Sequence, residues 1–351
     1  MRGNTARCAV PMGYRHELVQ TLIDFERAPA FAIALTDPVG DATVREGLLV
    51  EGPQGWGEFS PPGAGVDAAD GDAALVRWLT AAIEPGTVGW PDPVRGRVPV
   101  AVSVPVVDVR RAREIVDGSP CRTATVEVGA GSLDDDTARV AAVREVLGPE
   151  GALRCDARGR WDAQTARTAV AALDAAAGGL EFVERPCATL DDLVRLRKEI
   201  DVRIAAHATM RDTSADPAVP VDPRLREAAD VVVLACGPLG GARRALRVAE
   251  SSGLPCVVTS MWETTIGLAA GLAVAGALPE LPFACQLGTR PLLTGDLVAA
   301  SRSLVADADG CLPVAPMPPA PQPELLEQFA MADPARVAWW RERLRAAISA
   351  S

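Results

Sequence analysis

The pattern of hydrophobic and polar positions changes near residue 98 and divides the chain into two parts. Before that point, short alternating or apolar runs at residues 31–36, 46–51 and 55–62 predict three strands. Helical spacing over residues 73–83 predicts a helix, with Trp78 in the core, and a shorter helical pattern lies near residues 17–25. Residues 1–97 are therefore expected to form a small α+β domain.

From residue 98 onward, apolar strands alternate with helical segments rich in Ala, Leu and Arg. The predicted strands lie at residues 100–104, 123–128, 153–155, 180–183, 203–206, 231–234, 256–260 and 283–286. The predicted helices between them include residues 135–147, 163–177, 190–200, 241–252 and 266–277. Eight strands with helical crossovers favour a parallel (β/α) barrel over residues 98–312. The segment 313–351 is Pro-rich at first and then predicts helices at residues 323–332 and 334–348, which we expect to pack back on the first domain.

Polar residues end three successive strands of the predicted barrel. Asp156, Glu184 and His207 follow apolar runs and are spaced roughly 25 residues apart. The carboxyl ends of parallel strands meet at one mouth of a barrel, so the three side chains are expected to face the same space. The alternative is that each is an ordinary polar strand end.

Composition limits the partners and the compartment. The net charge of -11 argues against nucleic acid or an anionic membrane as partner and leaves a small molecule as the expected one. No apolar run reaches transmembrane length, and no apolar segment follows Arg2, Arg7 and Arg15 to make a secretion signal. The eight Cys lack metal-binding spacing and are typical of reduced thiols in the cytoplasm. The sequence gives no indication of the oligomeric state.

Basic residues are almost all Arg. The single Lys, Lys198, falls in a predicted helix and is expected on its solvated face. A reaction that needs a buried lysine therefore has no residue to supply it.

Several stretches of the chain resemble the enolase superfamily and, within it, the actinobacterial o-succinylbenzoate synthases of menaquinone biosynthesis. They are residues 44–47, 55–61, 121–124, 184–189, 229–234, 238–241, 259–271 and 278–285. The resemblance implies an N-terminal capping domain over a (β/α)7β barrel. It also implies a divalent metal, usually Mg²⁺, that holds a substrate carboxylate, and lysines on opposite strands that move the proton.

The residues at the family's catalytic positions differ from the family pattern. Thr125 and Glu127 stand at the Lys-x-Lys motif of the second strand, and Ala235 stands at the lysine of the sixth. His207 occupies the place of an acidic metal ligand, and Arg158 that of an asparagine. Only Asp156 and Glu184 remain as matched ligands. We therefore do not transfer the synthase activity to this chain.

Glu127, Asp156 and Glu184 would bring three carboxylates together, and something must offset their charge. One alternative is a cation such as Mg²⁺ or Mn²⁺ held by Asp156, Glu184 and His207. A second is that Arg158 or Arg160 pairs with Glu127 or Glu184, which implies a mouth without metal. A third is a protonated Glu127 that donates a hydrogen bond.

Further residues are candidates for the reaction or for the substrate. His207, Glu127 and Arg158 are the catalytic candidates if no metal binds. Ser260 and Glu263, at the end of the seventh strand, and Gly240 with Gly241, at a helix N-terminus, are candidates for substrate binding. A capping role is the alternative for Glu263. Cys155 and Cys236 are expected to be buried structural thiols that point away from the mouth.

Three functional hypotheses follow from these residues. The first is a repurposed lyase, isomerase or cyclase that acts on a small carboxylate or specialised metabolite. The second is a pseudoenzyme with a binding or partner role. The third is a residual o-succinylbenzoate synthase in which Glu127 or His207 replaces a lysine base.

Overall fold

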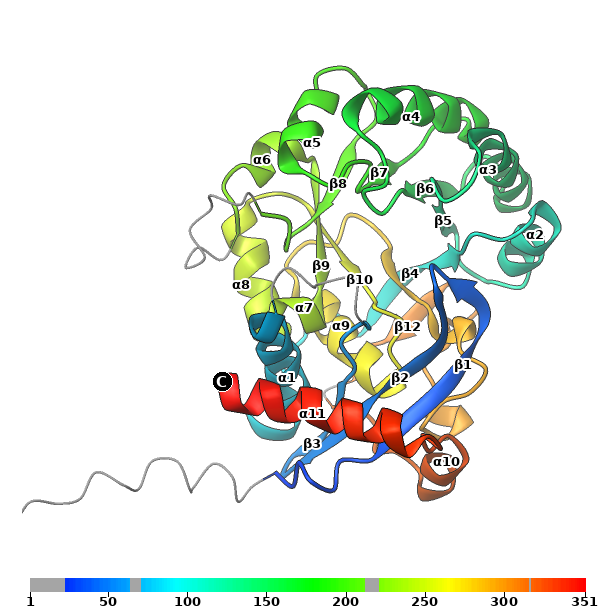
Figure 1. The fold of residues 1–351 in the computed structure, drawn as a ribbon. Helices are drawn as coiled ribbons and strands as arrows, with labels where there is room; N and C mark the ends of the chain where they lie inside the picture. The colour runs from blue at the N-terminus through cyan, green and yellow to red at the C-terminus, as the bar shows by residue number, and fades with distance from the viewer. Residues whose placement is uncertain (1–22, 64–70, 212–220, 316) are drawn as a thin grey trace, which may run out of the picture.

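The computed structural model describes residues 23–63, 71–211, 221–315 and 317–351. They form a three-stranded antiparallel sheet, a closed parallel barrel and a C-terminal helical segment that lies across the sheet (Figure 1). The helical pattern predicted near residues 17–25 falls almost entirely outside the described residues. No helix in the described ranges combines the length and the apolar character needed to cross a membrane.

The N-terminal layer contains the three predicted strands and the predicted helix. The strands are β1 (Ala30–Val39), β2 (Ala42–Gly52) and β3 (Gly55–Phe59), paired antiparallel in the order β1-β2-β3. Helix α1 (Gly71–Thr87) packs on β3, and its Trp78 is only 2% exposed. The prediction that Trp78 belongs to the core is therefore confirmed. The third strand is shorter than predicted and ends at Phe59.

Gly57 marks the closest approach between β3 and α1. A Cβ atom at this position would lie 1.8 Å from the backbone oxygen of Ala82, which has no rotamer by which to move away. We expect Gly57→Ala to lower the free energy of unfolding by about 3 kcal/mol or more, because strand and helix would have to separate. Urea denaturation would measure this loss. Gly63→Ala is the matched control, since an added Cβ there meets nothing within 4 Å, and an equal loss in both variants would contradict the packing argument.

The barrel is built from eight parallel strands that close through pairing of the last with the first. They are β4 (Arg97–Val104), β5 (Thr123–Glu127), β6 (Ala152–Asp156), β7 (Phe182–Glu184), β8 (Ile204–His207), β9 (Val231–Ala235), β10 (Cys256–Thr259) and β11 (Cys285–Gly288). All eight coincide with the predicted strands to within a few residues. The barrel follows from the sequence because strands buried on both faces read as continuous apolar runs. A short strand, β12 (Cys311–Pro313), adds antiparallel to β4, so the predicted boundary after residue 312 falls inside a paired strand.

Helices on the outside connect the strands (Figure 1). They are α2 (Val109–Asp117), α3 (Leu133–Leu147), α4 (Ala163–Ala177), α5 (Leu190–Leu196), α6 (Leu225–Ala228), α7 (Cys236–Leu239), α8 (Ala242–Ser252) and α9 (Thr265–Ala277), and the 3-10 helices η1 (Arg290–Leu292) and η2 (Ala300–Arg302) follow β11. Ser132, Asp162 and Thr189 cap the N-termini of α3, α4 and α5 through their side chains. Helix α5 ends four residues earlier than predicted, and Lys198 lies exposed just beyond it.

The C-terminal segment contributes α10 (Pro323–Gln328) and α11 (Pro334–Ala350). Helix α11 packs against α1, and its buried Trp340 and Leu344 join the same apolar cluster as Phe59 and Trp78. The N-terminal sheet is thus enclosed between the barrel and the last helix. This arrangement holds the cap residues described below against the mouth of the barrel.

Candidate active site

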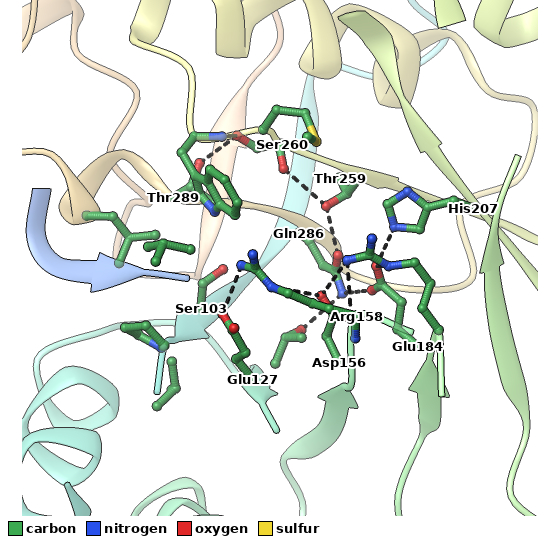
Figure 2. A pocket seen from close by; sticks show the side chains of 18 of the residues that line it. Ser103, Glu127, Asp156, Arg158, Glu184, His207, Thr259, Ser260, Gln286 and Thr289 are labelled. Atoms are coloured by element: carbon green, nitrogen blue, oxygen red, sulfur yellow. Dashed lines mark hydrogen bonds and ion pairs between the residues drawn. The ribbon is translucent and has the colours of Figure 1, made fainter. Parts of the chain in front are cut away.

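The carboxyl ends of β5, β6, β7 and β8 place four titratable side chains next to one another. The strand register pairs Glu127 with Asp156 and Asp156 with Glu184, and His207 ends the following strand. All four line a cavity of about 470 Å³ at the barrel mouth (Figure 2). The structure therefore brings the three strand-end residues together with Glu127 in one cavity, as the strand pattern predicts.

Glu127 is buried and is held by two guanidinium groups. Nη2 of Arg158 lies 2.8 Å from its Oε2, and Nη2 of Arg160 lies 2.7 Å from its Oε1. Arg160 also donates to the backbone oxygen of Val128 at 2.7 Å. The predicted pairing of Arg158 or Arg160 with Glu127 is thus present, with both arginines engaged. Each carboxylate oxygen of Glu127 thus faces a guanidinium, which is a donor, whereas the alternative in which Glu127 donates a hydrogen bond would need an acceptor there.

Asp156 accepts from a third arginine, which the sequence analysis did not single out. Nη2 of Arg185 lies 3.0 Å from Oδ2 and 3.3 Å from Oδ1 of Asp156. The backbone N–H of Arg158 donates to Oδ1 at 2.8 Å. Burial by itself lowers the pKa of Arg185, but the charges of Asp156, Glu184 and Glu127 outweigh it and raise that pKa above its ordinary value. Arg185 is therefore a permanent cation beside Asp156.

Glu184 and His207 form a short hydrogen-bonded pair. Nε2 of His207 lies 2.6 Å from Oε1 of Glu184, and Nε2 of Gln286 donates to Oε2 at 2.6 Å. The amide orientation of Gln286 is fixed in turn by Thr259, whose hydroxyl donates to Oε1 of Gln286 at 2.8 Å (Figure 2). Burial by itself raises the pKa of Glu184, but the hydrogen bond and charge of His207, with help from Arg185 and Gln286, lower it to about 2. Glu184 is thus a carboxylate, and Nε2 of His207 donates to it.

These contacts test whether the site suits the divalent metal that the resemblance implies. A metal would need free oxygens on Asp156 and Glu184 and a free nitrogen on His207. In this chain the oxygens of Asp156 accept from two arginines, and those of Glu184 accept from Gln286 and from the ring nitrogen of His207. Across the described ranges, no three His, Cys, Asp or Glu side chains are arranged to hold a metal ion. The residues as placed do not fit a divalent metal.

Backbone strain concentrates at the same cavity. Within the part of the chain that the structure describes, the non-glycine residues with positive φ are Arg158 (52°), Arg185 (42°) and Trp262 (63°), and all three line the cavity. Such conformations cost about 1–3 kcal/mol each and persist only where the surroundings impose them. The guanidinium of Arg158 also lies 4.8 Å from the ring centre of Trp262. Strain in three lining residues is typical of a functional site rather than of a structural strand end.

Of the two residues after β10 that were predicted to bind the substrate, one lines the cavity and the other does not. Ser260 lines the cavity, where its hydroxyl accepts from Thr289 at 2.9 Å. Glu263 does not line this cavity. It accepts from the hydroxyl of Ser260 at 2.6 Å and from the backbone N–H of Met261 at 2.8 Å, so it holds the turn after β10. This arrangement matches the capping alternative for Glu263.

Gly240 and Gly241 lie outside the cavity. The N-terminus of α8, which follows them, is already filled by the buried carboxylate of Glu84 from α1. Glu84 accepts from the backbone N–H of Ala242 at 2.5 Å and of Arg243 at 3.0 Å. These two glycines are therefore not carried into the substrate site, because the donors expected to bind an anion serve the cap domain instead.

The sequence analysis missed two residues of the site, Gln286 and Arg185, although both lie at or next to the end of a predicted strand. Gln286 ends the last predicted strand, residues 283–286, although β11 runs on to Gly288, and an amide at a strand end carries less chemical signal than a carboxylate. Arg185 directly follows Glu184, yet only its positive φ turns its guanidinium toward Asp156. The thiols of Cys155 and Cys236 are buried, as predicted, and burial raises the pKa of both.

Comparison with known proteins places this geometry in a family. Residues 108–318 match the enolase C-terminal domain-like family and residues 31–86 match the enolase N-terminal domain-like family. The chain belongs to the enolase superfamily. Superfamily members generally use a divalent metal such as Mg²⁺.

Curated superfamily relatives align along most of the chain. It is 46% identical over 323 residues to the o-succinylbenzoate synthase of Thermobifida fusca (strain YX). The alignment covers 92% of this chain and 96% of the relative. It is 41% identical over 322 residues to the o-succinylbenzoate synthase of Mycolicibacterium smegmatis, with 91% and 94% covered. The resemblance stated from the sequence is thereby confirmed.

Solved superfamily structures share the fold at low sequence identity. Muconate lactonizing enzyme from Pseudomonas fluorescens, complexed with muconolactone, aligns with a TM-score of 0.70 and 21% identity, covering 88% of this chain and 98% of that one. N-succinyl Arg/Lys racemase from Bacillus cereus aligns with a TM-score of 0.68 and 18% identity, covering 87% and 96%. These likenesses confirm the predicted capping domain over a (β/α)7β barrel.

Proposed function

We propose that this chain is a lyase or isomerase that moves a proton on a small carboxylate, with His207 as the base. The observation that carries the proposal is the 2.6 Å pair of His207 and Glu184 inside a cavity that also contains the guanidiniums of Arg158 and Arg185. The names of its curated relatives support a carboxylate as the substrate class, since o-succinylbenzoate is itself a carboxylate.

The pair assigns a role to each nitrogen of the imidazole. When the imidazole is neutral and Nε2 donates to Glu184, Nδ1 carries the lone pair, and Nδ1 has no hydrogen-bond partner among the described residues. Nδ1 can therefore take a proton, and Glu184 stabilises the imidazolium that results. Gln286 fixes the carboxylate from its other side and so keeps the ring in the required orientation.

The guanidiniums would stabilise the charge that develops on the substrate. Breaking the C–H bond next to the substrate carboxylate transfers the proton to Nδ1 and leaves the electron pair on the carboxylate as an enediolate. Fixed positive groups favour this dianionic species over the substrate monoanion. The enediolate then either takes the proton back at carbon, which gives an isomerisation, or expels a group from the neighbouring carbon with its bonding pair, which gives an elimination.

No ammonium is in place for the chemistry of the family's lysines. Ala235 carries no titratable group, Thr125 carries only a hydroxyl, and Lys198 is exposed beyond α5 on the outside of the barrel. Among the described residues that line the cavity, the imidazole of His207 is the one group with a basic nitrogen that has no hydrogen-bond partner. This is why we propose proton transfer by His207 rather than the reaction of the relatives.

Proton exchange in D₂O, followed by ¹H NMR, tests the proposal without knowledge of the product. The purified protein would be incubated, with and without EDTA, with a panel of small carboxylates that includes 2-succinyl-6-hydroxy-2,4-cyclohexadiene-1-carboxylate. Protein-dependent exchange or elimination on a panel member is the expected result. Turnover of the cyclohexadiene alone would favour a residual o-succinylbenzoate synthase. Binding of panel members without exchange would contradict the proposal and favour a non-catalytic binding role.

A further inference from the structure

Arg185 lies between the two carboxylates that the family resemblance assigns to a metal. The register of β6 and β7 sets Asp156 opposite Glu184. Nη2 of Arg185 lies 3.0 Å from Oδ2 of Asp156, and its Nε lies 3.7 Å from Oε1 of Glu184. One guanidinium thus contacts both of the carboxylates that would hold the implied cation.

The backbone of Arg185 adopts an unfavourable conformation to reach this position. With φ of 42°, the residue lies in the left-handed region that an arginine rarely adopts. Its Nε is in addition buried without an acceptor. Neither feature stabilises the fold, and both accompany the placement of one positive charge between Asp156 and Glu184.

Two guanidinium nitrogens remain available to a ligand. Nη1 of Arg158 and Nη1 of Arg185 have no hydrogen-bond partner among the described residues. Neither nitrogen is among the buried atoms that lack a partner, whereas the Nε atoms of the same residues are. Both residues line the same cavity, the space that a substrate would enter.

We propose that Arg185 is a built-in replacement for the divalent cation of the superfamily, so that the site binds an oxyanion directly through the guanidiniums of Arg185 and Arg158. A planar guanidinium pairs bidentately with a carboxylate, which is the ligand class we assign. Three arginines already neutralise the three carboxylates of the cavity, so little net negative charge remains to attract a divalent cation. The inference goes beyond the proposed function, since it would hold for a protein that binds without catalysis.

Two titrations of the intact protein test the inference without any turnover. Calorimetry with succinate measures anion binding before and after EDTA treatment, and electron paramagnetic resonance with Mn²⁺ alone measures metal binding. For the wild type we expect succinate binding that EDTA leaves unchanged, and no Mn²⁺ binding tighter than about millimolar. Stoichiometric Mn²⁺ at micromolar concentrations, or loss of succinate binding in EDTA, would overturn the inference.

Variants of Arg185 separate its charge from its shape. Arg185→Asn suits the left-handed backbone and removes the charge, so we expect at least a tenfold weaker affinity for succinate and a gain in Mn²⁺ affinity. Arg185→Lys keeps the positive charge but lacks the planar guanidinium that can bind a carboxylate through two N–H groups. This variant should retain part of the succinate affinity and bind no Mn²⁺. Arg195→Asn, on the exposed face of α5, is the charge-matched control and should change neither titration. Unchanged succinate affinity in a folded Arg185→Asn variant would contradict the inference, whatever the exchange assay shows.

Discussion

Replacing His207 with glutamine is expected to lower turnover by about 10²–10⁴-fold, which is the usual contribution of a positioned base. The glutamine amide can still donate to Glu184 in place of Nε2, so the carboxylate keeps its partner and the fold is retained. What the variant loses is the lone pair on Nδ1. The rate of proton exchange on the panel substrate that the wild type turns over is the measurement that checks this expectation.

The matched control lies directly before the same strand. Arg203 precedes β8 at the opposite end of the barrel and is exposed, so Arg203→Gln should exchange protons at the wild-type rate. A His207→Gln variant with wild-type exchange and unchanged substrate affinity would remove His207 from the reaction. The imidazole would then be a structural partner of Glu184.

Removing the side chain of Glu58 is expected to lower the free energy of unfolding by about 3–5 kcal/mol, as for a buried ion pair that loses one partner. Glu58 lies one residue before the end of β3 and has a fully buried side chain. Its Oε2 accepts from the backbone N–H of Thr264 at 3.0 Å and from the hydroxyl of Thr264 at 2.6 Å. Nη2 of Arg45 lies 3.6 Å from Oε1. Glu58→Ala would leave a buried guanidinium without its carboxylate and would separate the cap from the N-terminus of α9.

Urea denaturation at constant m-value would measure the loss. Glu51→Ala, at an exposed position on the neighbouring strand β2, is the control and should change stability by less than about 0.5 kcal/mol. An equally small loss in Glu58→Ala would show that the contact between cap and barrel depends on apolar packing alone.

The pH dependence of a second Glu58 variant has a definite sign. Burial raises the pKa of Glu58 above 4.5, although Arg45, Ser60 and Thr264 each act to lower it. The folded state therefore holds the proton more tightly than the unfolded state, and the contribution of Glu58 to stability declines as the pH rises above 4.5. The stability lost in Glu58→Gln should shrink over the same range. A loss that grew with pH would mean that the pKa is lowered instead.

The barrel and most of its mouth could be predicted from the sequence because their signals are local. A buried parallel strand is an apolar run, and the residue that ends it is read directly from the chain, which is how Asp156, Glu184 and His207 were found. The residue types at positions 125, 127 and 235 are read from the chain in the same way, and none of them is a lysine. The sequence by itself therefore determined the fold and the family.

Only the tertiary structure decided which charges meet. Gln286 is 102 residues from Glu184 in the chain and reaches it because the barrel closes. Glu84 fills the N-terminus of α8 from another domain, so Gly240 and Gly241 cannot serve the site. Arg185 reaches Asp156 because its backbone turns into the left-handed region, which no local propensity favours. Partners of this kind depend on distances between segments far apart in the chain, and hydrophobic periodicity carries no information about them.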